Sequence, residues 1–470
     1  MVTVRPAHSW IAESQPSCVA CIPSSPGHFV IGTYTLDDPS TDSPRGHGEA
    51  PTDTAESTSS SSEGEDKVKP QKRRGQLLTY HDRNEQCTED HSTRITLDSG
   101  ILDIVFSPHD HEVLFVATSE GSLAYLRVIK DPRATDLTDN DLGMDLICMI
   151  QVFDPSILIL DLVFHPTRED IIGVTTSTGG IYLLQVQHLP KSFFTNITAP
   201  ISISLAEVYR TTLEAWTLSF SPDGSALYFG SDDSALGTAQ LLPAPQLIFT
   251  PSPDPDPEAA SDTLLSSPHF RHQSPVQTCD PSTILTSTTS DTRTHGAGVV
   301  SILPLHSSSS NAVLLTGSYD DHIRVVRPSA PPVGRCLASL DLEGGVWRTS
   351  LVAHHMDAED EGRRKWLVLV ACMHAGAKIV EISCERWKEA IEGRGEGDGG
   401  FGIRVVAAME EHGSMCYAAE TIEGPMQART RGVVSASFYD KLCCAWKFEG
   451  PDWMAELEEE QGEVKTTKLN

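Results

Sequence analysis

Basic residues are scarce in this sequence. Its 470 residues include 35 Lys and Arg against 65 Asp and Glu, which gives a formal net charge of −30. A chain this acidic repels phosphate backbones, so its charge disfavours nucleic-acid binding. Basic protein surfaces and cationic groups are the partners that such a charge favours.

Long apolar runs and targeting signals are also missing. The longest apolar stretches, residues 156–164 and 366–373, are far shorter than the roughly 18 residues that span a bilayer. The N-terminus lacks the basic start and apolar run of a signal peptide. Of the eleven cysteines, only Cys18 and Cys21 show the two-residue gap of a metal or redox half-site. We therefore expect a soluble, cytoplasmic protein with free thiols.

Several segments have too few apolar residues to fold. Residues 37–66 hold nine acidic residues and one basic residue among Ser, Thr, Pro and Gly. Such segments cannot bury enough apolar surface to offset the entropy lost on ordering. We predict disordered insertions at 37–74 and 251–294 and an acidic tail at 451–470, around a single domain within residues 1–450.

The rest of the chain repeats a pattern of short strands. A strand ending in Ser-Pro or His-Pro occurs three times, as ILDIVFSP (101–108), ILDLVFHP (159–166) and WTLSFSP (216–222). Two strands joined by a tight turn of small residues occur six times, for example TTSTGGIYLLQV (175–186). With 34 Gly and 30 Pro as well, the composition is not that of a helical protein.

Repeats of about 40 residues are typical of β-propeller blades. The six echoes and a further unit within residues 27–80 predict an all-β, seven-bladed β-propeller. Because blades are held only by their neighbours, the ring must be closed, commonly by an N-terminal strand that completes the last blade. We predict this role for residues 18–22.

No strong catalytic motif accompanies this fold. The sequence has no GxSxG elbow, P-loop, HExxH, Rossmann glycine pattern or paired CxxC. Since fold does not fix function, composition and spacing alone favour an interaction platform over an enzyme.

A resemblance adds to this interpretation. Seven segments stand in the order and rough spacing seen in the diphthine methyltransferase family, a family of WD-repeat proteins. The similarity covers about residues 18–448 outside the insertions, and GGVWR followed by ACMH is its most specific part. The segments are GTYTL (32–36), Glu214-Ala215-Trp216, HGAGVVSI (295–302), TGSYDDHIRVV (316–326), GGVWR (344–348), ACMHAGAKI (371–379) and SFYDKLCCAW (437–446).

The resemblance implies a methyl esterase. Members of the family look like enzymes that hydrolyse the methyl ester of methylated diphthine on elongation factor 2, a late step of diphthamide biosynthesis. Water would be the co-substrate, and we expect no cofactor and no metal. The alternative is a non-catalytic WD-repeat adaptor for protein complexes. We further expect a monomer that binds modified elongation factor 2 at a channel entrance formed by blades five to seven, with no direct contact to nucleic acid or membrane.

Ester hydrolysis requires a nucleophile or activated water, a base, and donors for the developing oxyanion. The segments that resemble the family offer His374 and His412 as bases, Ser414 or Cys372 as nucleophile, and Arg348 or backbone amides as oxyanion donors. Each has a structural alternative: a histidine satisfied within a turn or loop, a turn serine, a buried thiol, or an arginine at the rim. The sequence leaves these alternatives open.

Two tryptophans and one acid complete the candidates. Trp216 and Trp347 either pack between blades or face the trimethylammonium group of the implied substrate by cation–π attraction. Where the family tends to have Asp, this chain has Glu420. The acidic loops would attract the same cationic group.

Overall fold

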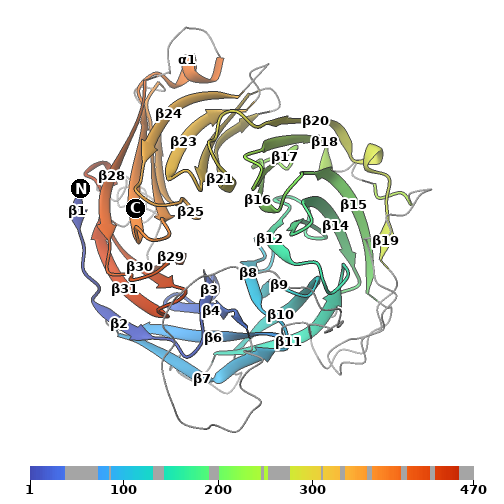
Figure 1. The fold of residues 1–470 in the computed structure, drawn as a ribbon, viewed down its shortest axis with the longest axis horizontal. Helices are drawn as coiled ribbons and strands as arrows, with labels where there is room; N and C mark the ends of the chain where they lie inside the picture. The colour runs from blue at the N-terminus through green and yellow to red at the C-terminus, as the bar shows by residue number, and fades with distance from the viewer. Residues whose placement is uncertain are drawn as a thin grey trace, which may run out of the picture.

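The strands form a ring of sheets around a central axis (Figure 1). This computed structural model describes residues 1–36, 72–83, 86–130, 142–189, 201–244, 248–251, 276–308, 311–328, 334–356, 362–392, 400–423 and 429–454. Within these ranges there are seven sheets of four or five strands, which confirms the predicted seven-bladed propeller. Most of the predicted insertions, namely 37–71 and 252–275, and residues 455–470 of the tail lie outside the described residues.

The first strand of each blade faces the axis. Blades 1 to 4 contain β3 (Pro16–Cys21), β4 (His28–Thr33), β6 (Arg73–Arg83) and β7 (Gln86–Leu97); β8 (Ile101–Phe106), β9 (Val113–Thr118), β10 (Ser122–Lys130) and β11 (Leu142–Gln151); β12 (Ile159–Phe164), β13 (Ile171–Thr176), β14 (Gly180–Gln187) and β15 (Ser202–Arg210); and β16 (Ala215–Phe220), β17 (Ala226–Ser231), β18 (Leu236–Leu241) and β20 (Leu285–Asp291).

The remaining blades follow the same order. Blades 5 to 7 contain β21 (Val299–Ser308), β22 (Asn311–Ser318), β23 (His322–Arg327) and β24 (Arg335–Asp341); β25 (Arg348–Met356), β26 (Arg364–Ala371), β27 (Ala377–Cys384) and β28 (Phe401–Met409); and β29 (Cys416–Glu423), β30 (Thr430–Ser437), β31 (Leu442–Glu449) and β2 (His8–Ile11). The short strands β1 (Val2–Thr3), β5 (Thr35–Leu36) and β19 (Gln277–Thr278) pair with β28, β6 and β15, and α1 (Trp387–Glu392) follows β27.

The burial of the strands follows from stacked blades. Every residue of β9, β13 and β17 is buried, because both faces of these second strands are covered by neighbouring sheets. The turns between second and third strands are as tight as their small residues predict. Gly121 has a φ of 63°, and a Cβ there would lie 2.6 Å from the carbonyl oxygen of Asp154, so glycine is required at this turn.

The ring is closed by a different strand from the one predicted. β2 pairs antiparallel with β31, with His8 opposite Ala445 and Ile11 opposite Leu442, and thereby completes blade 7. The prediction that residues 18–22 close the ring is wrong. Cys18 lies instead in β3, the inner strand of blade 1, since the alternating burial of this segment suits a strand between two blades.

Parts of the predicted disordered segments are ordered. Within 251–294, β20 pairs with β18 as the outer strand of blade 4, and the fully buried Ile284 anchors it. Its Ser/Thr-rich sequence suits an edge strand, which needs backbone pairing and β propensity more than apolar burial. In the predicted tail, Trp453 is buried and donates from Nε1 to Glu381 Oε2 at 2.9 Å.

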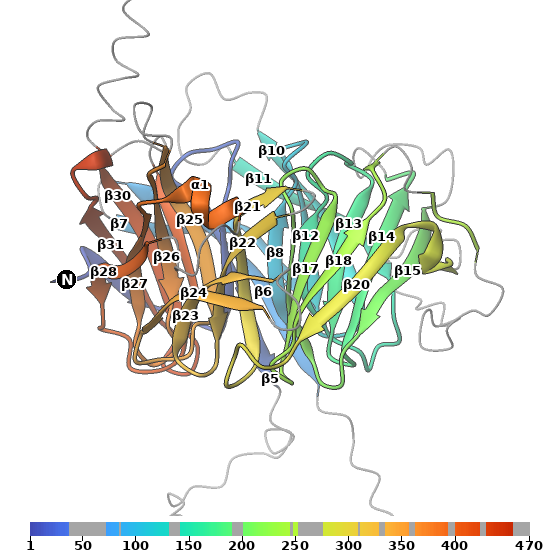
Figure 2. The ribbon, with the colours of Figure 1, turned by 90° about the horizontal axis from the view of Figure 1, so that it is seen from above.

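Connections of two kinds meet at one end of the ring, which we call the turn face. These are the turns between the second and third strands of each blade, and the links from one blade to the next. Figure 2 shows β5 at this lower edge and α1 at the opposite, upper edge. Over the described ranges, no helix has the length and apolar character to cross a membrane.

Deleting residues 1–11 tests the closure. Without β2, the outer edge of β31 loses its partner, and Ala445 and Cys443 lose cover in the blade core. We expect the apparent thermal midpoint to fall by several degrees, as for a loss of about 2–4 kcal/mol, in a scan followed by circular dichroism. Deleting residues 455–470 is the control and should leave the midpoint unchanged. Equal midpoints for both deletions would contradict closure by β2.

Candidate functional site

A cavity of about 250 Å³ occupies the axis of the ring. Residues from the inner strands of all seven blades line it, so the site depends on closure of the ring. At one level each inner strand contributes one side chain: Cys18, Asp103, Asp161, Thr217, Ser301, Thr349 and Ala418. Among the described residues, no group of three or more His, Cys, Asp or Glu is arranged to hold a metal ion.

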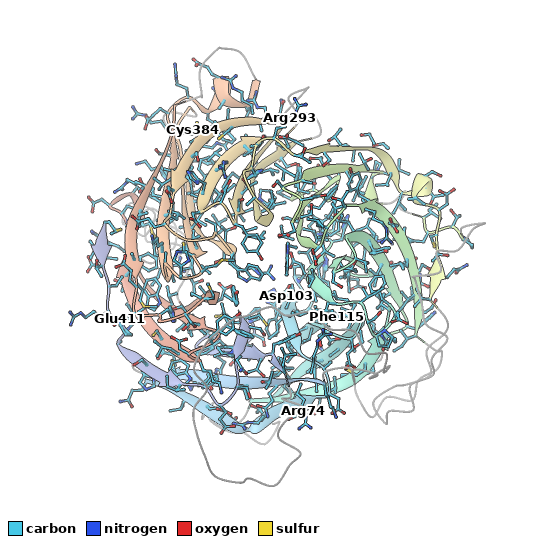
Figure 3. All side chains as sticks on the ribbon, in the orientation of Figure 1. Arg74, Asp103, Phe115, Arg293, Cys384 and Glu411 are labelled. Carbon is cyan, nitrogen blue, oxygen red and sulfur yellow. The ribbon has the colours of Figure 1, made fainter. Side chains whose placement is uncertain are left out.

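Arg348 projects across this level toward two aspartates. Its Nη1 donates to Asp161 Oδ1 at 3.0 Å, and its Nη2 lies 3.6 Å from Asp103 Oδ1. The aspartates are buried, whereas the side chain of Arg348 is 29% exposed. Figure 3 labels Asp103 beside the central opening. The cavity therefore contains a cation held between two carboxylates from blades 2 and 3.

Backbone groups position both aspartates. Leu162 N donates to Asp103 Oδ2 at 3.3 Å, and Leu218 N donates to Asp161 Oδ2 at 3.0 Å. Each aspartate thus accepts a hydrogen bond from the inner strand of the next blade, whose channel-side N–H groups have no neighbouring strand to pair with. The same contacts fix the carboxylates in space and link blades 2, 3 and 4.

The electrostatics of the two aspartates favour acid–base chemistry. Burial raises the pKa of Asp103 to about 7, Arg348 opposes the shift, and the adjacent Asp161 carboxylate adds to it. Burial tends to lower the pKa of Arg348, but the two carboxylates outweigh burial and raise it. Near neutral pH the site then holds a permanent cation and a carboxyl pair that can share one proton.

Two further ionisable groups line the cavity. Glu420 Oε1 accepts from Thr421 N at 2.9 Å, and burial raises the pKa of this carboxyl. The substitution of Glu for the family's Asp therefore leaves an acid on the cavity wall. Burial, reinforced by Asp103, raises the pKa of Cys18 to about 12, so its thiol stays protonated.

Five aromatic rings form a contiguous series at the turn face, and one of them, Tyr417, lines the cavity. Trp347 packs on Tyr417 and Trp216 with ring centroids 4.8 and 5.4 Å apart, and Tyr319 contacts both tryptophans at 6.0 and 6.4 Å. Phe438 extends the series from Tyr417 at 5.8 Å. We call these five half-buried residues the aromatic collar. They come from blades 4 to 7, so the two tryptophans predicted from the sequence lie together at the channel entrance.

His412, predicted as a base, lies inside blade 7. It is 6% exposed, and its two ring nitrogens lie 2.8 and 2.9 Å from the hydroxyls of Ser437 and Ser435. Trp446 Nε1 donates to the same Ser435 hydroxyl at 3.0 Å. Burial lowers the pKa of His412 to about 4, although Asp440 opposes the shift. These contacts fit the structural alternative, a histidine that ties the blade together.

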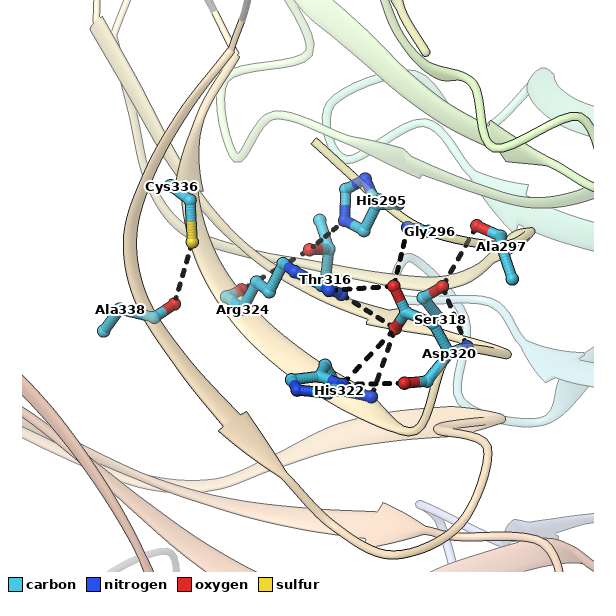
Figure 4. A network of polar contacts seen from close by, with 10 residues as sticks. All are labelled: His295, Gly296, Ala297, Thr316, Ser318, Asp320, His322, Arg324, Cys336 and Ala338. Atoms are coloured by element: carbon cyan, nitrogen blue, oxygen red, sulfur yellow. Dashed lines mark hydrogen bonds and ion pairs between the residues drawn. The ribbon is translucent and has the colours of Figure 1, made fainter. Parts of the chain in front are cut away.

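Blade 5 repeats the arrangement, as Figure 4 shows. His295 Nε2 lies 2.8 Å from the Thr316 hydroxyl, and burial followed by the charge of Arg324 lowers its pKa to about 4. Asp320 accepts from Gly296 N at 2.7 Å and from Arg324 Nη1 at 2.8 Å. A histidine and a turn aspartate in equivalent places of two blades indicate a structural motif of the repeat.

The other predicted bases and nucleophiles, like His412, do not line the cavity that contains Arg348. Ser414 donates to Asp440 Oδ1 at 2.8 Å and accepts from Tyr439 N at 3.0 Å, so it holds the β30–β31 turn. His374 is exposed in the β26–β27 turn. Cys372 is fully buried, and burial raises its pKa to about 12. Of the predicted bases, nucleophiles and oxyanion donor, only Arg348 lines the channel. The eleven cysteines, all within the described ranges, form no disulfide.

The sequence reasoning missed Asp103 and Asp161. The signal was present, because ILDIVF and ILDLVF place an aspartate at the same position of two otherwise apolar inner strands. A carboxylate repeated in a buried strand requires a partner, and Arg348 supplies it. No sequence spacing indicates that blade 6 provides this partner, since Arg348 lies 187 residues from Asp161.

The sheets, the inner-strand cavity and the histidine contacts define a seven-bladed WD-repeat β-propeller with an ionisable channel. Two curated proteins named Diphthine methyltransferase are similar in sequence. The one from Schizosaccharomyces pombe is 25% identical over 352 residues, covering 74% of this chain and 78% of the relative. The one from Saccharomyces cerevisiae is 25% identical over 368 residues, covering 74% and 83%. These two relatives support the resemblance to the diphthine methyltransferase family that the sequence indicated.

No family model matches the sequence. A chain in the crystal structure of the mitotic checkpoint complex is similar with a TM-score of 0.49 and 10% identity, covering 96% of this chain and 93% of that one. Sqt1 of Chaetomium thermophilum bound to the N-terminus of ribosomal protein L10 is similar with a TM-score of 0.48 and 12% identity, covering 93% and 88%.

Replacing His412 by Ala tests its structural role. At pH 7 the change removes one hydrogen-bond partner from each of Ser435 and Ser437, and we expect the free energy of unfolding to fall by about 2 kcal/mol in urea denaturation. The folded pKa, about 4, lies below the unfolded value of 6.5. The stability contributed by the neutral imidazole is therefore fully present above pH 6.5 and lost as the pH falls toward 4.

The difference between wild type and His412→Ala should accordingly shrink as the pH is lowered from 7 to 4.5. His374→Ala, at an exposed turn, is the matched control and should change stability by less than about 0.5 kcal/mol. A His412→Ala protein as stable as wild type at pH 7 would contradict the structural role.

Proposed function

We propose that this protein hydrolyses the methyl ester of methylated diphthine on elongation factor 2, a late step of diphthamide biosynthesis. The names of its two relatives support a role in diphthine chemistry. The observation that carries the hydrolytic direction is the set Arg348, Asp103 and Asp161, which joins an oxyanion donor to a carboxyl pair in one cavity. Ester hydrolysis needs these elements and no cofactor.

In the proposed step, ionised Asp161 takes a proton from water as the water oxygen attacks the ester carbonyl carbon. Negative charge develops on the carbonyl oxygen, where free N–H groups of the Arg348 guanidinium stabilise it. Protonated Asp103 then gives its proton to the departing methoxide, and methanol leaves. The carboxyl pair again holds one proton, and the new carboxylic acid releases its own proton to solvent.

Arg348 suits this task because its charge is already partly balanced. With Asp161 ionised and Asp103 protonated, the three groups carry no net charge, so a neutral ester can enter without displacing a counterion. The pair Asp103 and Asp161 can exchange roles between turnovers, since only one proton is needed between them. Cys18 lies beside the pair, but its raised pKa makes direct attack by water the simpler route.

The modified elongation factor would dock on the turn face. This is the end of the ring at which the half-buried aromatic collar lies, and blades five to seven supply four of the five collar residues. A macromolecular substrate needs only to present one long side chain to a cavity of about 250 Å³. No nucleic-acid or membrane contact enters this proposal.

A direct assay tests the activity. Purified protein is incubated with elongation factor 2 carrying methylated diphthine, and methanol release and a loss of about 14 mass units from the substrate are followed. Arg348→Met and Asp161→Asn should each lower kcat by about 100-fold or more, because the first removes the oxyanion donor and the second the base. His374→Ala, on an exposed turn, should retain activity.

Several results would contradict this assignment. Absence of release by folded wild-type protein would favour the non-catalytic adaptor. Full activity of Arg348→Met would exclude the channel as the site of the reaction. Loss of activity in His374→Ala with an unchanged thermal midpoint would place the base in the β26–β27 turn instead. Circular dichroism and thermal midpoints of each variant separate lost chemistry from lost folding.

The pH profile tests the acid. Asp103 must be protonated to give its proton to methoxide, and its pKa is about 7. On the alkaline side, kcat/KM should therefore begin to fall near pH 7 and fall about tenfold per pH unit well above 7. In Asp103→Asn the residual rate should lose this alkaline limb, after correction for spontaneous ester hydrolysis. A flat wild-type profile between pH 6 and 9 would exclude Asp103 as the acid.

A further inference from the structure

We propose that the aromatic collar is a specificity subsite for a quaternary ammonium group, which in the substrate class above is the trimethylammonium beside the ester. The proposal rests on the proposed function for the identity of the natural ligand. The ammonium preference itself is a property of the collar and can be measured without turnover.

The collar has the composition of an ammonium site. Three of its rings, Trp216, Tyr319 and Trp347, contact one another with centroids 5.4 to 6.4 Å apart, and Tyr417 adds a fourth at 4.8 Å from Trp347. Four aromatic residues from four different blades meet at one point of the turn face. They are half-buried, so part of each remains accessible, whereas core aromatics such as Tyr228 and Phe229 are almost fully buried.

Carboxylates add negative charge at the collar. Asp232 lies close to it, since a Cβ on Gly298 would be 2.8 Å from Asp232 Oδ1 and 3.0 Å from a ring carbon of Tyr319. Burial raises the pKa of Tyr319, and the carboxylates of Asp232 and Glu214 raise it further. The field that disfavours a phenolate at Tyr319 favours a cation in front of the rings.

A quaternary ammonium fits these groups better than a protonated amine. It has no N–H to donate, so it gains little from a hydrogen-bonded carboxylate, and it is weakly hydrated enough to lie on aromatic faces. Carboxylates near the rings attract it at a distance without requiring a direct ion pair. The collar therefore favours a methylated nitrogen over a neutral group of the same shape.

The collar and the reaction cavity are continuous. Tyr417 lines the cavity together with Glu420 and Arg348, and Trp347 immediately precedes Arg348 in the chain. A substrate whose ammonium and ester are close together can then place the first on the collar while the second reaches the guanidinium. Binding of the ammonium would fix the ester next to Asp103 and Asp161.

A pair of small probes tests the subsite. Choline and its neutral isostere 3,3-dimethyl-1-butanol are titrated into the full-length protein, and binding is followed by isothermal titration calorimetry and tryptophan fluorescence. We expect choline to bind with a dissociation constant in the millimolar range and the isostere at least about tenfold more weakly. Trp347→Leu should weaken choline binding about tenfold, and Trp347→Phe should restore most of it.

Trp10→Leu is the matched control. Trp10 is a half-buried tryptophan on β2, in the outer strand of blade 7, and the change should leave choline binding unaltered. Thermal midpoints verify that each variant is folded, and Tyr319→Leu replaces Trp347→Leu should the latter not fold. Equal binding of choline and the isostere, no binding of choline at 50 mM, or a Trp347→Leu protein that binds as well as wild type would overturn the proposal.

Measurements of turnover distinguish this proposal from the proposed function. If both hold, Trp347→Leu raises KM for the modified elongation factor by about tenfold with a smaller change in kcat, the reverse of the effect of Arg348→Met. If wild-type protein releases no methanol yet binds choline selectively, the hydrolase fails and the subsite stands. A trimethyllysine peptide that displaces choline more strongly than the modified elongation factor would assign the subsite to a different methylated protein and overturn the link to diphthine.

Discussion

Closure of the ring is the constraint on which the rest of this structure depends. Each sheet buries its faces only against its neighbours, so a missing seam would expose apolar strands on two blades. β2 closes the seam by pairing with β31, and the inner strands then surround one cavity. Blade 1 follows directly from this closing strand, which places Cys18 beside Asp103 of blade 2.

The closed ring also positions the ionisable groups of the cavity. Inner strands present N–H groups that no further strand can satisfy, and Asp103 and Asp161 accept two of them from adjacent blades. Burying carboxylates is costly unless a cation compensates, and Arg348 from blade 6 does so across the axis. A contact that joins blades thus also creates a proton-sharing pair beside a permanent cation. The aromatic collar lies above it on blades 4 to 7.

The repeat itself gives His412 a structural role. His412 and His295 occupy equivalent places, are buried with hydroxyl partners and have pKa values lowered to about 4. Such a residue ties a blade together and stays neutral at pH 7. Ser414 and Asp440 hold the adjoining turn in the same way. In a repeat protein, polar residues at recurring positions serve the blade first, and Arg348 stands out because other blades have no counterpart to it.

The sequence by itself determined the seven blades, the inner strands such as ILDIVF, the tight small-residue turns and the family resemblance. These follow from local periodicity and short motifs, which do not depend on distant contacts. Only the tertiary structure decided which strand closes the ring, that LTSTTSD forms an edge strand, and that Asp103 and Asp161 meet Arg348. The reason is that these contacts join residues up to hundreds of positions apart, and the ring geometry brings them together.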